Sequence, residues 1–214
     1  MVPFSKETLR LYLVTDRPLA LGRDLIGVVE EAVSGGVTLV QLREKDLDTR
    51  DFVALGRRLH EVLAPRNVPL LINDRIDVAL AVGADGVHIG QSDMCYADAR
   101  ALLGSDAIIG LSVENEAQAL EANAMDLQYI ALSPVYLTGT KTDTSAALGL
   151  EGVRRITALS RHPSCGIGSM NETTAADVIR AGADGIAVVS AIMSAPDPRK
   201  ASETLWKIVN DALL

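Results

Sequence analysis

Short apolar runs alternate with stretches of helical spacing along the whole chain. The first apolar run covers residues 11–16 and ends in polar residues, and in residues 24–34 the apolar positions fall on one face of a helix. The same alternation repeats to the end of the sequence. It predicts strands at residues 11–16, 37–42, 69–72, 86–89, 107–111, 129–132, 164–167 and 186–189. It predicts helices at residues 24–34, 51–63, 76–82, 96–103, 114–122, 150–159, 171–180 and 202–213.

The predicted strands are short and continuously apolar, which is typical of parallel strands that are buried on both faces. Eight strand–helix units in 214 residues predict an α/β fold, a (β/α)₈ TIM barrel that forms one domain over residues 1–214. The tetrapeptide Gly-Ala-Asp-Gly at residues 83–86 recurs at 182–185, each time between a helix and a strand, and supports a repeated unit. A doubly wound open sheet remains the alternative.

Composition narrows the choice of ligands. The formal net charge of −8 argues against broad nucleic-acid binding, so an anionic ligand needs a local cluster of cations or a metal.

No apolar run reaches the roughly 18 residues of a membrane helix, and residues 1–10 lack the apolar core of a signal peptide. The two cysteines, Cys95 and Cys165, have neither disulfide-framework nor metal-ligand spacing, so the reducing cytoplasm is the expected compartment. The sequence leaves homo-oligomer formation open.

Polar residues gather where the predicted strands end, and the active sites of TIM barrels lie at that end. Cations, carboxylates, hydroxyls and glycine amides are expected to converge there, which suits a phosphorylated small molecule. The residues concerned are Gln41, Arg43, Lys45, Asn73, Asp74, Asp93, Ser112, Thr138, Gly139, Thr140, Lys141, Gly168, Ser169 and Ser190.

The two cations after the second strand are two positions apart, so in an extended segment they point to the same side. Arg43 and Lys45 can therefore bind adjacent phosphate oxygens. The alternative is a set of surface ion pairs with Glu44 and Asp46.

Asp74 and Asp93 follow neighbouring strands and are suited to Mg²⁺, with water and phosphate oxygens as the remaining ligands. The alternative for such residues is helix capping. His88 lies within a strand among apolar neighbours, which favours a hydrogen-bonded core histidine over a general base.

The connection over residues 133–149 has no periodicity of its own and is longer than an ordinary loop. Its segment from Thr138 to Lys141 combines two hydroxyls, a glycine and a cation, which suits a phosphate. A solvated polar flap is the alternative. Gly168 and Ser169 precede a predicted helix and can present backbone amides to a second phosphate.

Five motifs taken together resemble the thiamine-phosphate synthase family, over residues 11 to about 198. They are Gln41-Leu42-Arg43-Glu44-Lys45, Asn73-Asp74-Arg75, His88-Ile89-Gly90-Gln91-Ser92-Asp93, Thr138-Gly139-Thr140-Lys141 and Val189-Ser190-Ala191-Ile192. The family is a group of transferases of thiamine biosynthesis. They join a hydroxymethylpyrimidine diphosphate to a thiazole phosphate and release pyrophosphate.

The resemblance implies a role for each motif. It implies that the pyrimidine diphosphate is held by Gln41, Leu42, Arg43, Glu44, Lys45, Asn73, Ser112 and Lys141. It implies contacts to the thiazole phosphate from Thr138, Gly139, Thr140, Gly168, Ser169, Val189 and Ser190. It implies Asp74 and Asp93 as ligands of Mg²⁺, and Arg43, Lys45 and Lys141 as the catalytic residues that stabilise the departing pyrophosphate.

Three positions depart from the family pattern: Ser133 and Ser169 stand where glycine is usual, and Leu137 where proline is usual. None of them removes a charged group. A thiazole tautomerase-like relative and a non-catalytic protein that binds a thiamine precursor are the alternative functions. Retention of the cations and of Asp93 favours the synthase, because a tautomerase has no diphosphate to release.

Overall fold

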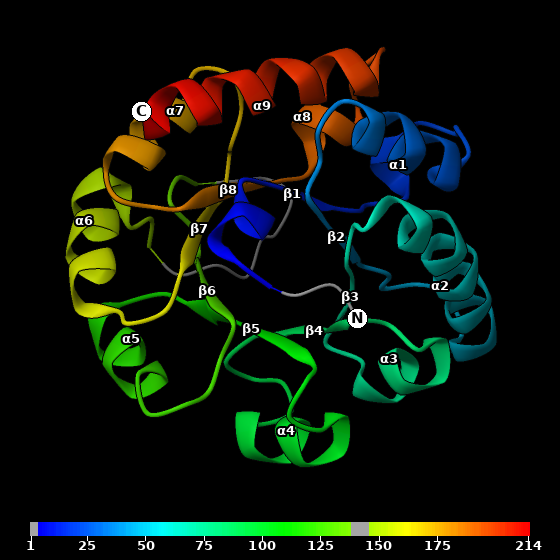
Figure 1. Cartoon of the computed structure of the whole chain (residues 1–214), viewed down its shortest axis with the longest axis horizontal. Coiled ribbons are helices and arrows are strands. Elements are labelled where there is room, and N and C mark those ends of the chain that lie inside the picture. The colour runs from blue at the N-terminus through cyan, green and yellow to red at the C-terminus, as the bar shows by residue number, and fades with distance from the viewer. Residues whose placement is uncertain (1–3, 138–145) are drawn as a thin grey trace.

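Eight parallel strands close into a barrel in sequence order, each paired with the next and the last with the first. The computed structural model describes residues 4–137 and 146–214. Figure 1 looks down the barrel, with the strands as an inner ring. The fold is the predicted (β/α)₈ TIM barrel, and the open sheet is excluded. The strands are β1 (Leu11–Val14), β2 (Leu39–Leu42), β3 (Leu70–Asn73), β4 (Gly86–Ile89), β5 (Ile108–Val113), β6 (Tyr129–Leu132), β7 (Ser164–Ile167) and β8 (Gly185–Val188).

Helices form the outer ring and cover the strands (Figure 1). Several begin at a capping side chain that the sequence provides: the Asp24 and Asp48 carboxylates accept hydrogen bonds from Gly27 N and Asp51 N at the starts of α1 and α2. The helices are α1 (Leu25–Ser34), α2 (Thr49–Leu63), α3 (Ile76–Val82), α4 (Tyr96–Leu103), α5 (Glu116–Ala122), α6 (Gly149–Leu159), α7 (Ala175–Arg180), α8 (Ser190–Met193) and α9 (Pro198–Leu213).

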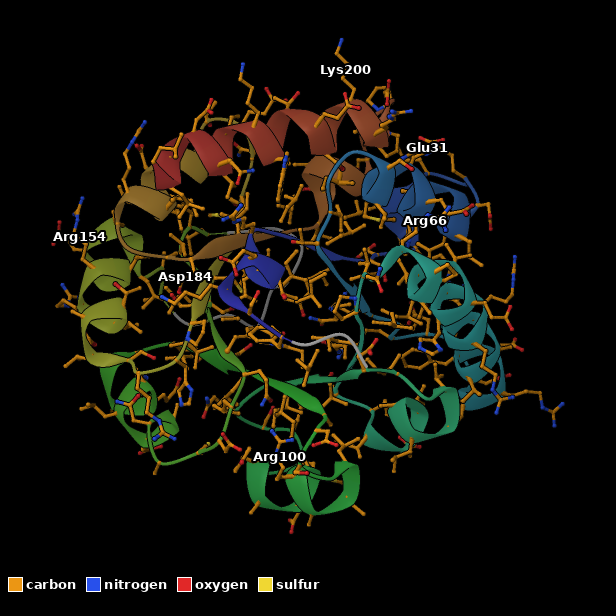
Figure 2. The ribbon with its side chains drawn as sticks, in the orientation of Figure 1. Glu31, Arg66, Arg100, Arg154, Asp184 and Lys200 are labelled. Carbon is orange, nitrogen blue, oxygen red and sulfur yellow. The ribbon has the colours of Figure 1, made fainter. Side chains whose placement is uncertain are left out.

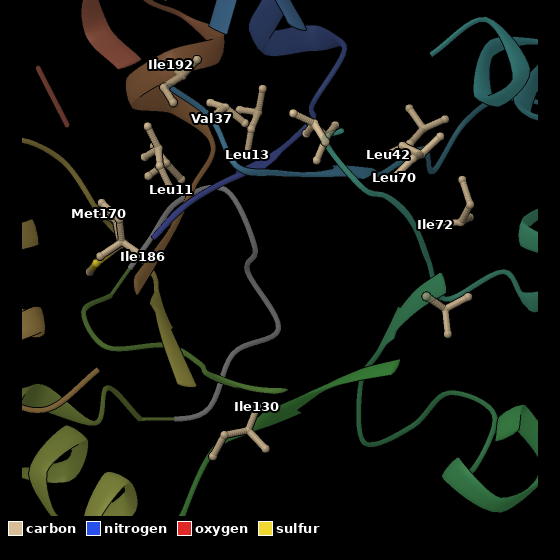
Figure 3. Close-up of a cluster of buried hydrophobic side chains, with 14 of the residues drawn as sticks. Leu11, Leu13, Val37, Leu42, Leu70, Ile72, Ile130, Met170, Ile186 and Ile192 are labelled. Carbon is tan, nitrogen blue, oxygen red and sulfur yellow. The ribbon is translucent and has the colours of Figure 1, made fainter. Parts of the chain in front are cut away.

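The strand side chains form two separate apolar layers. Alternate positions point outward against the helices, as Leu11, Leu13 and Ile130 do in Figure 3. The intervening positions, such as Tyr12 and Tyr129, fill the barrel interior. This period of two is the ordinary geometry of a strand, and it decides which residues can reach the barrel axis.

The amino-terminal end of the barrel is closed by a segment that the sequence pattern did not predict. The 3₁₀ helix η1 (Lys6–Leu9) lies within the ring of strands in Figure 1, and Leu9 is buried among the interior side chains. The Lys6 ammonium pairs with the Asp184 carboxylate at 2.8 Å, just before β8. Because this end is plugged, the interior is left to open at the carboxyl ends of the strands.

Two predicted helices begin four residues away from the observed start, and three further short helices were not predicted. Asn171 does not cap α7, because its side chain accepts from Thr173 N at 2.9 Å in a local turn, and the helix begins at Ala175. The last helix begins at Pro198, capped by Asp197, before its first apolar position. The four-residue α8 and the short 3₁₀ helices η2 (Pro18–Ala20) and η3 (Ala64–Arg66) were not predicted, since they are too short for a helical period.

Among the described residues, no helix is both long and apolar enough to cross a membrane.

Candidate active site

A cavity of about 510 Å³ opens at the carboxyl ends of the barrel strands. Its size lies within the range of small-molecule sites. Most of the described residues that the sequence assigned to a site line this cavity together, although they come from six different strand ends. Those that line it are Gln41, Arg43, Lys45, Asn73, Asp74, Asp93, Ser112, Gly168, Ser169, Val189 and Ser190. The segment Thr138 to Lys141 lies outside the described residues.

Only alternate residues of the motif after β2 face this cavity. Gln41, Arg43 and Lys45 line it, and for Arg43 and Lys45 the spacing predicted a common side. Leu42 is fully buried on the other side of the strand, and Figure 3 shows it pointing outward beside Leu70. Leu42 and Glu44 therefore do not line the cavity, because an extended strand turns neighbouring side chains to opposite sides. Their assignment to the pyrimidine diphosphate stays a prediction.

Glu44 lies outside the cavity and forms an ion pair with Arg17, a residue that follows β1. Its side chain is only 3% exposed and accepts a hydrogen bond from the Arg17 guanidinium at 3.0 Å. Burial raises the pKa of Glu44 above its usual value, although Arg17 opposes the shift. Its Oε1 has no hydrogen-bond partner in the part of the chain that the structure describes. Glu44 thus ties the segment after β2 to the segment after β1.

Both cations of the motif hold a carboxylate at the cavity. The Lys45 ammonium contacts Asp74 Oδ2 at 2.7 Å, and an Arg43 guanidinium nitrogen lies 3.5 Å from Asp16 Oδ2. The sequence alternative of ion pairs with Glu44 and Asp46 is thus not what forms. These pairs are partly exposed and contribute little to stability, but they hold both cations at the strand ends, where an anionic ligand can reach them.

The two carboxylates proposed for a metal lie on one wall of the cavity. Burial raises the pKa of Asp93, and the neighbouring Asp74 carboxylate raises it further, while the N–H of Gly90 opposes the rise through a 2.7 Å hydrogen bond. Asp74 adopts a left-handed backbone conformation with φ 61°, an unusual geometry that often marks functional sites.

This donor set fits a hard cation such as Mg²⁺, because two oxygen-bearing anions are held together against their own repulsion. Among residues 4–137 and 146–214, no group of three or more His, Cys, Asp or Glu side chains gathers for a metal. A Mg²⁺ ion bound by Asp74 and Asp93 would therefore need water or ligand oxygens to complete its octahedron.

After β7 the backbone turns through two left-handed residues. Gly168 has φ 106°, and a Cβ there would lie 2.7 Å from the Tyr136 carbonyl oxygen, so only glycine fits. Ser169 has φ 53°, the conformation that explains why glycine is usual at this position. Its hydroxyl donates to the Leu137 carbonyl oxygen at 2.6 Å, so its proton is already used within the protein.

The floor of the cavity holds polar residues that the pattern at the strand ends did not predict as part of the site. Tyr12 and His88 line it from the inward-facing positions of β1 and β4. Both ring nitrogens of His88 are hydrogen-bonded, to the Tyr129 hydroxyl at 2.8 Å and to Ser112 Oγ at 2.9 Å. The prediction of a hydrogen-bonded core histidine is confirmed, but the ring also reaches the site. Alternation along β1 and β4 turns both side chains inward, but the strand register that brings them to the cavity comes from the structure alone.

Comparison with known proteins agrees with this geometry. The sequence profile of the family described as thiamine monophosphate synthase matches residues 11–192. The chain is 49% identical over 199 residues to the thiamine-phosphate synthase of Clostridium novyi, covering 93% of this chain and 98% of that one. It is 53% identical over 199 residues to the thiamine-phosphate synthase of Leptospira biflexa, covering 91% and 95%. The structure of thiamine phosphate pyrophosphorylase from Pyrococcus furiosus superposes with a TM-score of 0.90 at 38% identity, covering 98% of this chain and 99% of that one.

The left-handed turn predicts a particular order of stability for substitutions at Ser169. Ser169→Ala loses the hydrogen bond to Leu137 but keeps the strained Cβ, and should lower the free energy of unfolding by about 1 kcal/mol. Ser169→Gly loses the same bond but relieves the strain, so it should be about 1 kcal/mol more stable than the alanine variant. Urea unfolding of the three proteins measures this order. An alanine variant as stable as the glycine variant would contradict the left-handed conformation.

Proposed function

The chain belongs to the thiamine monophosphate synthase family, and we propose that it joins 4-amino-2-methyl-5-(diphosphooxymethyl)pyrimidine to a thiazole phosphate, giving thiamine phosphate and pyrophosphate. The observation that carries this proposal is the convergence of Arg43, Lys45, Asp74 and Asp93 on one cavity of an otherwise acidic protein. That set matches the needs of a diphosphate leaving group.

The reaction transfers the pyrimidine methylene carbon from oxygen to nitrogen. The carbon–oxygen bond to the diphosphate breaks and its electron pair leaves with pyrophosphate. The thiazole nitrogen supplies the electron pair of the new carbon–nitrogen bond and becomes a cationic thiazolium. No proton has to move and no protein nucleophile is needed, so the enzyme's task is to position both substrates and stabilise charge.

We assign the developing charge on pyrophosphate to Arg43 and Lys45, whose side chains face the same cavity. Charge stabilisation by preorganised cations contributes most when the charge grows in the transition state. Asn73 and Ser112 line the same cavity and supply further polar contacts to the pyrimidine diphosphate. Lys141, outside the described residues, is proposed as the third cation from the family motif.

Asp74 and Asp93 are proposed to hold Mg²⁺ with the diphosphate. When bound, the ion would neutralise charge on the diphosphate oxygens and so make pyrophosphate a better leaving group. The Asp74 carboxylate also holds Lys45 at 2.7 Å, so the same residue keeps the ammonium beside the metal ligands.

The thiazole phosphate is proposed to bind on the opposite side of the cavity, where the turn after β7 and the start of α8 lie. The backbone of Gly168 and Ser169 would contact the phosphate, because the serine hydroxyl proton is given to Leu137. Val189 and Ser190 line this side as well. Thr138, Gly139 and Thr140 complete the proposed phosphate contacts from the family motif.

The decisive test is product formation by the purified protein with both substrates and Mg²⁺. We expect thiamine phosphate and pyrophosphate in equal amounts, loss of both after treatment with a chelator, and recovery when Mg²⁺ is restored. A tautomerase would isomerise the thiazole without releasing pyrophosphate, and a precursor-binding protein would bind without turnover. Either outcome would refute the synthase, and full activity in the chelator would refute the metal.

Removing the Lys45 charge should slow turnover more than it weakens binding. Lys45→Met keeps most of the length of the side chain, and we expect kcat to fall on the order of 100-fold with a smaller change in KM. Lys200→Met is the matched control, because Lys200 projects into solvent from α9 (Figure 2) and should leave kcat unchanged. Steady-state kinetics of the two variants and the wild-type protein measure kcat and KM. A rise in KM at constant kcat would make Lys45 a binder of the ground state only.

A further inference from the structure

Five buried or half-buried polar side chains form an unbroken hydrogen-bonded chain across the barrel interior. Gln41 Nε2 contacts the Tyr12 hydroxyl, which lies 2.9 Å from the Tyr129 hydroxyl. Tyr129 lies 2.8 Å from His88 Nδ1, and His88 Nε2 lies 2.9 Å from Ser112 Oγ. We call these five residues the polar relay. It joins two residues already assigned to the pyrimidine diphosphate, one on β2 and one on β5.

The relay has a direction, because an amide nitrogen can only donate. Gln41 donates to Tyr12, whose single proton then goes to Tyr129. Tyr129 gives its own proton to His88 Nδ1, and the imidazole proton on Nε2 is donated to Ser112. The Ser112 hydroxyl proton is then left to point into the cavity, and Gln41 Oε1 remains as an acceptor.

The direction can reverse only if every member reverses together. A break at any one point would leave a buried donor facing a donor, or an acceptor facing an acceptor, which is costly inside a protein. Burial raises the pKa of both phenols, so Tyr12 and Tyr129 keep their protons and remain donors. The reversed chain would also need the Gln41 amide turned over.

Packing holds the central tyrosine in place. The rings of Tyr12 and Tyr129 meet edge to face with centroids 5.8 Å apart, and Phe4 stacks on the Tyr129 ring at 5.9 Å. Gly110, opposite Tyr129 in the strand register, provides the space: a Cβ there would overlap the Tyr129 ring. The relay is thus built into the barrel and is not a chance meeting of surface groups.

We propose that the relay fixes Gln41 Oε1 as a hydrogen-bond acceptor at one end and the Ser112 hydroxyl as a donor at the other. Tyr12, Tyr129 and His88 are thereby positioning residues that select the aminopyrimidine. This inference rests on the proposed function. Gln41 Oε1 takes no hydrogen bond from any residue that the structure describes. It is held as an acceptor for the exocyclic amino group of the substrate, while Ser112 offers a proton to an acceptor on the same molecule.

A site of this kind distinguishes pyrimidines by whether their exocyclic group donates or accepts a hydrogen bond. A pyrimidine with an exocyclic oxo group in place of the amine presents an acceptor to the acceptor Gln41 Oε1. A free amide would turn over and accommodate it, but an amide tied to Tyr12 cannot do so without reversing the whole relay. Sites with fixed hydrogen-bonding groups discriminate strongly between such analogues.

The test measures kcat/KM for the aminopyrimidine diphosphate and for its oxo analogue. The variants are Tyr12→Phe, Tyr129→Phe, the double variant and the matched control Tyr96→Phe. Tyr96 loses a comparable hydrogen bond, the one it accepts from Asp126 N at 3.0 Å, but it lies on α4 outside the barrel. The intrinsic reactivities of the two compounds are the same in every variant, so a change in their ratio reports on the site.

We expect the wild-type protein and Tyr96→Phe to share one high preference for the amino compound. Tyr12→Phe should lower that preference at least tenfold, because the Gln41 amide is released. The double variant should show about the same loss as Tyr12→Phe alone, since members of one unit are not additive. Equal losses for both compounds in the relay variants would reduce the relay to a structural role and overturn the proposal.

A second measurement tests the relay without substrate. The ¹⁵N chemical shifts of the His88 ring, identified among the three histidines with His88→Gln, report which nitrogen carries the proton. We expect a protonated Nε2 and an unprotonated Nδ1. The opposite tautomer, or a doubly protonated ring, would overturn the direction of the relay. If wild-type protein turned over neither compound while His88 showed the expected tautomer, the proposed function would fail and the relay would stand.

Discussion

Side-chain alternation along eight short parallel strands is the constraint on which the site depends. A closed barrel has one interior and one exterior, so each strand residue either fills the interior or packs against a helix. At the carboxyl ends the interior positions become the walls of the cavity. Gln41, Arg43 and Lys45 therefore face the cavity together. Leu42 packs in the apolar layer between the strands and the helices, and Glu44 pairs with Arg17.

The same constraint explains how an acidic protein provides for an anionic substrate. The protein has a net charge of −8, and its cavity is lined by the cations Arg43 and Lys45 together with the carboxylates Asp74, Asp93 and Glu114. Carboxylates hold the two cations at 3.5 and 2.7 Å. Beneath them the interior positions of five strands, β1, β2, β4, β5 and β6, carry the polar relay instead of aliphatic side chains. A layer of cations above a layer of directional hydrogen bonds suits a molecule with a diphosphate at one end and a polar heterocycle at the other.

Much of this architecture could be predicted from the sequence, because it is encoded by local patterns. Apolar runs located all eight strands, and the residues at their carboxyl ends gave eleven of the 24 described residues that line the cavity; others, such as Glu114 and Met170, were not predicted. The plug η1 could not be predicted, since its role depends on contacts such as Lys6–Asp184 that are distant in sequence. The relay was missed for the same reason: His88 and Tyr129 are 41 residues apart and read individually as core residues. Motif matching also included Leu42 and Glu44, which strand geometry turns away.

We propose that the inward-facing residues at the carboxyl ends of the strands form one site for both phosphorylated substrates. The most direct measurement is a crystal structure of the protein with Mg²⁺, pyrophosphate and thiamine phosphate. We expect pyrophosphate beside Arg43 and Lys45, the metal on Asp74 and Asp93, and the pyrimidine above the polar relay. Pyrophosphate bound outside this cavity, or a pyrimidine that contacts neither Gln41 nor Ser112, would contradict it.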